Sequence, residues 1–494
     1  MTLNDGLTAL IGASAVLAHV AIAGAVTVHV LLYKRNVGTS VSWIGIAWLS
    51  PFLGALLYVI MGVNRVKRRA QRLRRERLSF GTAEESLADA AADDPLTPLE
   101  FAVGRLTGLP CELGNKIELL HSGDEAYPRM LAAIAAAEKS VGLVSYIFRA
   151  DKAGEAFHQA LIQAQRRGVE VRVLIDGVGG GYFWSGTYNH LRQAGVPVAR
   201  FLHSYLPWRM PFVNLRNHRK VLVVDGRIGF TGGLNIGAEN IRADNPPLVV
   251  LDTHFQLEGP IVEQLTDAFA DDWLFTTGEK LLTDHWFPPI EKAGTVTARV
   301  VTSGPDEDME QIEYVALHAI SCAHKSIRVV TPYFLPPDPL TMALGLAAMR
   351  GVKVDIVLPD HSNHALLDWA RRIPLRPLIE VGCRVWLTAA PFDHSKLMVI
   401  DDAWAMVGSA NWDTRSFRLN FELNVELHDP DFAIKVAAIA PQARRLTLAE
   451  LDGDPLPIRL RNSAARRLTL AELDGDPLPI RLRNSAARLL QPYL

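Results

Sequence analysis

Cysteine is scarce in this sequence, which has only Cys111, Cys322 and Cys383 among its 494 residues. An odd number at unrelated spacings excludes a disulfide framework and a zinc knuckle, and it is typical of a reducing compartment. Excess positive charge is also missing, because the formal net charge is −2, which argues against a generally basic nucleic-acid-binding protein. The chain does have length and 49% hydrophobic residues, enough for two ordinary domains with additional segments.

Two long runs near the N-terminus contain no Asp, Glu, Lys or Arg. Residues 7–32 and 41–63 each meet the requirement of roughly 20 residues for crossing a bilayer, so they predict a transmembrane helical hairpin. A cleaved signal peptide is disfavoured for the first run, because the run is too long and no basic segment precedes it. The basic run NRVKRRAQRLRRER at 64–77 predicts that the larger C-terminal part lies in the cytoplasm. Residues 64–112 are predicted to be a basic juxtamembrane segment and linker.

Two later stretches share one pattern, NHRKVLVVDG at 217–226 and DHSKLMVIDD at 393–402. Alternation along a strand places the His and the Lys of each stretch on the same face. A single copy would be explained by a strand with a polar first turn and an Asp-Gly hairpin, but a second copy favours a function. The matched residues are His218, Lys220 and Asp225 in the first copy and His394, Lys396 and Asp401 in the second.

The segments around these motifs also repeat. KSVGLVSYIF at 139–148 is similar to KSIRVVTPYF at 325–334, and RGVEVRVLI at 167–175 is similar to RGVKVDIVL at 350–358. Short β-rich runs alternate with segments of helical spacing, which indicates an α/β fold. The chain is therefore predicted to contain two similar α/β domains, at 113–290 and 291–442. A dyad between them could bring the two motifs together.

Two imidazoles and two ammonium groups around one small volume would suit a phosphate diester. The ammonium groups and nearby Asn donors would stabilise the negative charge that develops, while one His attacks phosphorus and the other protonates the leaving oxygen. The motif Asp side chains could orient the imidazoles or offset the Lys charges. A metal site competes with this hypothesis, but a Lys two residues from each His would repel a divalent cation, and no HExxH motif occurs. We therefore expect no metal and no other cofactor.

The two HxKx4D patterns, each followed by Gly and Asn, resemble the paired signature of the phospholipase D superfamily. More narrowly, the two hydrophobic runs together with FTGGLNIGAEN, TPYFLPP and GSANWDTRSFRLNFELNVE resemble bacterial cardiolipin synthases of the phospholipase D type. The resemblance covers nearly the full chain to about residue 442 and one copy of a tail segment. It implies two phospholipase D-like α/β sandwich domains related by a pseudo-twofold, one active site between them, and a multi-pass protein of the bacterial inner membrane.

The resemblance also implies a reaction in which one phosphatidylglycerol gives its phosphatidyl group to another, producing cardiolipin and glycerol. His218 would be the nucleophile and His394 the general acid and later the base, although nothing in the residues themselves breaks the near-symmetry. Tyr146 and Tyr333, at matched places in the halves, are expected to be core residues. Glu422 would support the site. The remaining positions that match the family's phosphate-holding groups are Lys220, Lys396, Asn235, Asn411, Gly233 and Ser409.

Other functions stay open at this point. A membrane-bound phospholipase that releases phosphatidate, or a phosphatidyltransferase with another alcohol acceptor, would need the same His and Lys residues. A nuclease would have little use for two membrane spans, and the body lacks a broad basic groove. A scaffold would be expected to have lost one motif. The expected partners are phosphatidylglycerol and membrane lipids, without nucleic acid, and the sequence predicts no oligomeric state.

The tail at 443–494 contains an exact duplication. ARRLTLAELDGDPLPIRLRNSA occupies 443–464 and occurs again at 465–486. Two units are fewer than the three or so that a solenoid needs, so the repeat indicates a duplication rather than a functional array. One copy is expected to pack on the body and the other to be a looser insertion.

Overall fold

A computed structural model describes residues 3–33, 37–50, 52–62, 96–204, 215–244, 246–305, 310–439 and 443–452. The chain divides into two compact units. The first comprises Met1–Arg72 with His203–Asn214, and the second comprises Leu73–Leu202 with Leu215–Leu494. The predicted basic run at 64–77, most of the predicted linker and the second tail copy lie outside the described residues.

Within the described residues of the first unit, one helix is long and apolar enough to cross a membrane. Helix α1 spans Leu3–Tyr33, and its segment Ile11–Tyr33 has the length and hydropathy of a membrane span, which agrees with the prediction for 7–32. The second hydrophobic run differs from the prediction. It forms α2 (Val37–Leu49), α3 (Leu53–Leu57) and a π-helical turn at Tyr58–Gly62.

The expected continuous helix over 41–63 is therefore wrong, and the local chemistry explains the break. Pro51 removes a helical N–H donor, and Phe52 has a positive φ of 58°. The chain turns so sharply there that a Cβ at Gly54 would lie 2.2 Å from the carbonyl oxygen of Ile46. At about 1.5 Å per residue, the 13 residues of α2 are too short for a bilayer core of about 30 Å.

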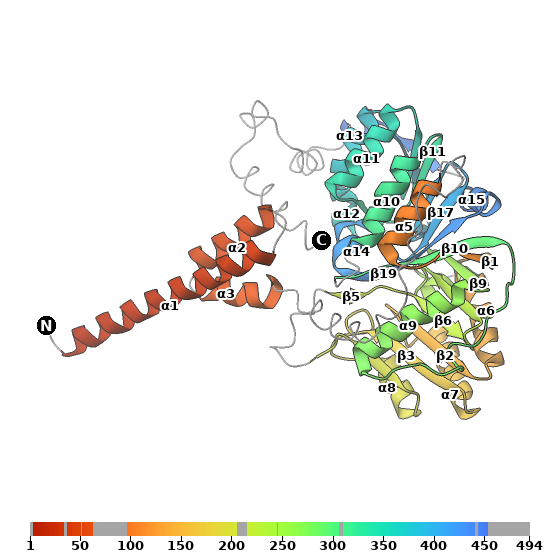
Figure 1. The fold of residues 1–494 in the computed structure, drawn as a ribbon, viewed down its shortest axis with the longest axis horizontal. Coiled ribbons are helices and arrows are strands. Elements are labelled where there is room, and N and C mark those ends of the chain that lie inside the picture. Colours follow the sequence, from red (N-terminus) through yellow and green to blue (C-terminus); the bar gives the residue numbers. More distant parts are fainter. Residues whose placement is uncertain are drawn as a thin grey trace. The chain divides into compact units, whose positions relative to one another are not determined.

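The second unit is built on one 16-stranded sheet (Figure 1). In its first half the strands are β1 (Glu112–His121), β2 (Ser140–Ser145), β3 (Glu170–Asp176), β4 (Val198–Phe201), β6 (Val221–Val224), β7 (Ile228–Gly232) and β9 (Thr253–Glu258). In its second half they are β10 (Val296–Ser303), β11 (Ser326–Val330), β13 (Lys353–Pro359), β14 (Arg384–Thr388), β16 (Leu397–Ile400), β17 (Trp404–Gly408) and β19 (Asn420–His428). The short strands β5 (Arg216–Asn217), paired with β19, and β20 (Ala443–Leu446), paired with β14, complete the sheet.

The strand order shows that the two halves are equivalent. It runs β14-β13-β11-β16-β17-β19-β10 and continues β1-β9-β7-β6-β2-β3-β4, so each half repeats the other in reverse order. Antiparallel pairing of β10 with β1 joins them. The central strands are buried on both faces, as the continuous apolar run Val221–Val224 in β6 requires. This topology confirms the predicted α/β fold of two similar halves.

Helices cover the faces of the sheet and close two hydrophobic cores. Apolar side chains recur at helical spacing in α7, where Phe157, Leu161 and Ala164 are buried and Asp151 caps the first turn by accepting from the Gly154 N–H. The helices of the first half are α6 (Ser122–Ala136), α7 (Lys152–Arg166), α8 (Gly186–Gln193) and α9 (Ile261–Thr277). Those of the second half are α10 (Gln311–Cys322), α11 (Asp338–Met349), α12 (Ala365–Ala370), α13 (Arg372–Glu380), α14 (Thr414–Arg418) and α15 (Pro430–Ala437).

Two further segments pack on the second half. Helix α5 (Thr97–Thr107) lies within the segment predicted as a linker, and it buries Leu99 and Val103 in the second core, so the packed body begins before residue 113. The first tail copy begins with β20 (Ala443–Leu446), which pairs with β14, and continues with α16 (Leu448–Asp452). One copy thus packs on the body, as predicted.

Candidate active site

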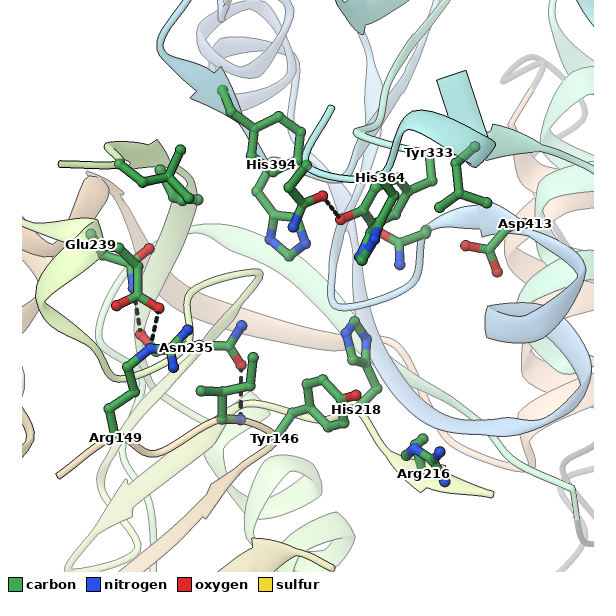
Figure 2. Close-up of a pocket in the computed structure, with 18 of the residues that line it drawn as sticks. Tyr146, Arg149, Arg216, His218, Asn235, Glu239, Tyr333, His364, His394 and Asp413 are labelled. Atoms are coloured by element: carbon green, nitrogen blue, oxygen red, sulfur yellow. Dashed lines mark hydrogen bonds and ion pairs between the residues drawn. The ribbon is translucent and has the colours of Figure 1, made fainter. Parts of the chain in front are cut away.

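The structure brings the two motif histidines to one cavity. His218 immediately follows the two-residue strand β5 (Arg216–Asn217) and precedes Lys220 and β6, and His394 stands at the matching position before β16. Both line a cavity of about 690 Å³ at the junction of the two halves, together with Asn235 and Asn411. Figure 2 shows the rings of His218 and His394 on facing walls of this cavity. The central expectation from the repeated motif is met by this geometry.

Each imidazole is held by a carboxylate from the opposite half. The Nδ1 atom of His218 lies 3.0 Å from Oε2 of Glu422, which belongs to β19. The Nδ1 atom of His394 lies 2.7 Å from Oδ2 of Asp252, which directly precedes β9. These contacts fix the ring orientations and leave Nε2 of each ring for a ligand. Sequence reasoning found Glu422 but missed Asp252. An alignment of the β9 segment in the first repeat with the β19 segment in the second would have matched Asp252 with Glu422.

The motif lysines are buried beside the histidines. Nζ of Lys220 donates to the carbonyl oxygen of His218 at 2.6 Å, and Nζ of Lys396 lies 2.8 Å from Nδ1 of His394 and 3.9 Å from Asp252. Burial lowers the pKa of Lys220 to about 7 and that of Lys396 to about 8, although Glu422 and Asp252 respectively act in the opposite direction. Both amines therefore titrate in the neutral range.

The remaining titratable groups complete the electrostatics of the site. Burial lowers the pKa of His218, and burial together with the Lys396 ammonium lowers the pKa of His394 to about 3, so both rings are neutral at pH 7. Burial alone would raise the pKa of Asp252, but Lys396 and His394 lower it below its ordinary value. A neutral imidazole can act as a nucleophile or a base, and the charged carboxylate beside it stabilises the imidazolium that forms.

The motif aspartates lie far from the imidazoles, so the expectation that they orient these rings is wrong. The carboxylate of Asp225 accepts from the backbone N–H groups of Lys139 and Ser140, at 2.7 and 2.8 Å. Asp401 does the same for Lys325 and Ser326, at 2.7 Å each. In each motif an extended strand separates the Lys from the Asp by about 16 Å. The aspartates therefore fix the starts of β2 and β11.

Gly233 and Ser409 lie against the two carboxylates. The hydroxyl of Ser409 donates to Oε2 of Glu422 at 2.6 Å, and a Cβ at Gly233 would lie 2.2 Å from Oδ1 of Asp252. The serine thus satisfies Glu422, while the glycine leaves room for Asp252. Asn235 fits the predicted phosphate-binding role better, because its Oδ1 accepts from the Ile147 N–H at 3.2 Å and its amide nitrogen remains for a ligand.

Aromatic and basic side chains that the motifs do not include complete the cavity wall. The ring centre of Tyr146 lies 4.9 Å from that of His218, and the ring centre of Tyr333 lies 5.9 Å from that of His394. Both tyrosines line the cavity. Tyr333 is also buried, as expected of a core residue, whereas Tyr146 is only partly buried, so the expectation is wrong for Tyr146. Arg216 and Arg415 add positive charge to the same wall. A wall with several cations and neutral imidazoles is suited to a phosphate diester.

Comparison with known proteins gives consistent matches. Residues 130–273 and 316–442 match the family model described as cardiolipin synthase, phospholipase D-like domain. The chain is 33% identical over 416 residues to a cardiolipin synthase of Geobacillus thermodenitrificans, with 82% of each chain covered. It is 32% identical over 450 residues to the major cardiolipin synthase of Bacillus subtilis, with 87% of this chain and 93% of the relative covered. For cardiolipin synthase A of Pseudomonas aeruginosa the identity is 34%, covering 83% and 85%.

The fold also matches a solved structure. The crystal structure of phosphatidylserine synthase from Haemophilus influenzae is similar to this chain with a TM-score of 0.61 at 16% sequence identity. The similarity covers 80% of this chain and all of that one. At this level of identity the match supports the two-half architecture.

Proposed function

Because this chain belongs to the cardiolipin synthase family of phospholipase D-like proteins, we propose that it transfers a phosphatidyl group between two phosphatidylglycerol molecules and releases glycerol. The observation that carries this proposal is the pair of motif histidines on one cavity, each with a carboxylate from the opposite half. The enzyme is a phosphatidyltransferase, and its phosphorus chemistry is assigned to these two imidazoles.

The first step would form a covalent intermediate. Nε2 of His218 attacks the phosphorus of the donor lipid, the bond from phosphorus to the glycerol oxygen breaks, and His394 gives that oxygen its proton. Burial and the Lys396 ammonium disfavour protonation of His394, but an anionic lipid would offset the lysine charges and Asp252 stabilises the imidazolium. Lys220 and Lys396 stabilise the negative charge on phosphorus as the bond to histidine forms.

The second step would return the enzyme to its starting state. His394 takes the proton from a hydroxyl of the second phosphatidylglycerol, the oxygen of that hydroxyl bonds to phosphorus, and His218 leaves as a neutral imidazole. Because the two halves are nearly symmetric, the order of the two histidines is tested by trapping the intermediate. With an activated phosphatidyl substrate, His394→Ala should accumulate an adduct on His218, and finding the adduct on His394 in the unmutated enzyme would reverse the assignment.

Water in place of the second lipid would make the enzyme a phospholipase. Purified protein incubated with isotope-labelled phosphatidylglycerol vesicles, with and without a chelator, separates the two reactions by mass spectrometry of the lipids. We expect labelled cardiolipin and glycerol in both cases, because Lys220 and Lys396 supply the positive charge. Phosphatidate as the sole labelled product would overturn the synthase proposal in favour of hydrolysis.

Membrane association of the chain agrees with helix α1. We propose further that the catalytic unit faces the cytoplasm, because the basic run at 64–77 lies between the hydrophobic segments and this unit. The bacterial inner membrane is the corresponding location, and a multi-pass arrangement stays a prediction.

A further inference from the structure

The loop between β3 and α8 presents two consecutive large aromatic side chains to solvent. Phe183 and Trp184 are each 78% exposed. Leaving such side chains in water forgoes about 1.5–3 kcal/mol of burial free energy for each. Neighbouring exposed apolar groups of this size are typical of a contact surface.

The exposure of these rings follows from a fixed backbone. The guanidinium of Arg200 donates to the carbonyl oxygens of Gly177 at 3.2 Å and Tyr182 at 2.7 Å, and it also reaches that of Gly181. At the start of the loop, the Asp176 carboxylate accepts from the N–H groups of Val178 and Gly179 at 2.8 and 2.7 Å. These bonds hold the loop at both ends, so its conformation directs the two aromatic side chains outward.

The loop lies next to the catalytic cavity. A Cβ at Gly179 would lie 2.4 Å from the carbonyl oxygen of Tyr146, and Tyr146 is part of the cavity wall. Two more exposed apolar side chains belong to segments that line the same cavity. Leu248, 57% exposed, lines it directly, and Leu366, 55% exposed, precedes the cavity residue Leu367 on α12. We call Phe183, Trp184, Leu248 and Leu366 the apolar rim.

The composition of the loop suits a lipid surface. Residues 177–191 contain no Asp, Glu, Lys or Arg, so insertion would remove no charged group of this segment from water. Tryptophan and phenylalanine are common in segments that lie at the boundary between lipid head groups and acyl chains. The rim also receives residues from both halves, as an opening shared between them requires.

We propose that the apolar rim inserts into the surface of a phospholipid bilayer, so that the catalytic cavity opens onto the lipid head groups. This inference rests on the proposed function, because a cavity that accepts two diacyl lipids needs an entrance that keeps their acyl chains out of water. A protein partner fits less well. A stable protein interface would need to bury more than about 1,000 Å² around this opening and would cover the entrance of the substrate.

The test compares one substrate chemistry in two physical states. Full-length enzyme with Phe183→Ser and Trp184→Ser is assayed on phosphatidylglycerol in vesicles and on a short-chain phosphatidylglycerol below its critical micelle concentration. We expect kcat/KM on vesicles to fall about tenfold or more, which corresponds to about 1.4 kcal/mol, while kcat/KM on the dispersed lipid stays within about twofold.

Leu282→Ser is the matched control. Leu282 is 65% exposed and close in sequence to His285, which contacts Glu170 at the first residue of β3, whereas the loop with Phe183 and Trp184 follows the last residue of β3. It should change neither value.

A second readout reports insertion directly. Vesicles that contain brominated phospholipid should quench part of the tryptophan fluorescence of the enzyme, and Trp184→Phe should lose that part while keeping an apolar side chain. Unchanged vesicle kinetics in the Phe183→Ser/Trp184→Ser enzyme, or no quenching of Trp184, would overturn the proposal. Equal losses on both substrates would also overturn it, as damage to the cavity. If the unmutated enzyme makes no cardiolipin from either substrate, the proposed function is wrong. The quenching measurement then still tests whether the apolar rim inserts into the bilayer.

Discussion

Asp252 and Glu422 have equivalent tasks at the two histidines, although only Glu422 belongs to a recognisable motif. The carboxylate of each accepts a hydrogen bond from the Nδ1–H of its histidine and so stabilises the proton on that atom. The motif residue Asp225 instead binds backbone N–H groups at the start of β2. Two aspartates of the first half therefore act on different properties of the protein.

Substitution separates these properties. Asp252→Asn should lower kcat by about 10²- to 10⁴-fold with little change in thermal stability, because an amide neither fixes the tautomer of His394 nor stabilises its imidazolium. Asp225→Asn should lower the free energy of unfolding by about 1–3 kcal/mol through loss of the hydrogen bonds from backbone N–H groups to a charged carboxylate, and leave kcat of the folded enzyme nearly unchanged. Steady-state kinetics and thermal melts of both variants check this. A collapse of kcat in Asp225→Asn would contradict the separation.

The lysine pKa values predict an alkaline limit to activity. Lys220 at about 7 and Lys396 at about 8 both lie below the ordinary lysine value, so the ammonium groups lose their protons as pH rises through this range. We expect kcat/KM to fall there, and Lys220→Arg to shift the start of this fall to higher pH, because Lys220 loses its proton first and a guanidinium keeps its charge. The same two lysines give the free energy of unfolding the opposite pH dependence from the activity. Between these values and about 10.4 the unfolded chain binds more protons, so their contribution to the free energy of unfolding rises with pH. A thermal midpoint that falls together with activity from pH 7 to 9 would contradict this explanation.

Among the elements, β10 connects the two halves and also anchors α5. Arg299 on β10 is buried, and its Nε lies 2.6 Å from Oε1 of Glu426 on β19. Its other nitrogens donate to the carbonyl oxygens of Glu100 in α5 and Leu109 beyond it, at 2.8 and 3.1 Å. One guanidinium therefore links the centre of the sheet to the helix that the sequence did not predict.

Breaking this ion pair on one side should be costly. Arg299→Met leaves the buried Glu426 carboxylate with only the indole N–H of Trp404 at 3.1 Å and the His428 ring at 3.8 Å, and we expect a loss of about 3–5 kcal/mol in the free energy of unfolding. The double variant Arg299→Met/Glu426→Met should lose less than Arg299→Met alone, because no unpaired charge remains. Chemical denaturation in a single detergent measures both. A double variant that is less stable than the single one would show that the hydrogen bonds to α5 dominate.

At the scale of the whole molecule, the duplicated tail contains two identical segments, but the body offers one place where such a segment packs, the edge of β14. The first copy supplies β20 against β14, and Leu446 and Leu451 enter the second core. The second copy has the same residues, and the edge of β14 is already paired with β20. Only one copy can occupy that position.

Deletion of 22 residues, 465–486, should therefore leave cardiolipin synthesis intact and the thermal midpoint within about 2 °C, equivalent to less than about 1 kcal/mol. Removal of either copy gives the same chain, so the result does not depend on which one is chosen. Deletion of 443–486 is the control, because it exposes the edge of β14 and uncovers the core around Leu446, and it should lower the midpoint clearly. A large loss in the shorter deletion would mean that both copies are engaged.

The sequence by itself determined the two α/β halves and the equivalent positions of His218 and His394 in them, whereas the tertiary structure brought the two rings to one cavity. Both follow from local rules, because strand alternation fixes which side chains share a face, and a repeated motif at the start of equivalent strands occupies equivalent positions. The apolar run at 7–32 likewise predicted α1 from composition alone. The second run was not predicted correctly, because one proline and the turn after it outweighed its uniform hydropathy.

Only the tertiary structure decided which groups act on the histidines. His218 meets a carboxylate 204 residues away along the chain, and His394 meets one 142 residues away, each in the other half. Such a pairing depends on how the two halves of the sheet join through β1 and β10, and no local sequence pattern encodes it. The same holds for the packing of α5 on the second half and for the exposure of Phe183 and Trp184. Hydrophobicity in sequence indicates a tendency toward burial, but the backbone bonds of Arg200 and Asp176 decide where those rings point.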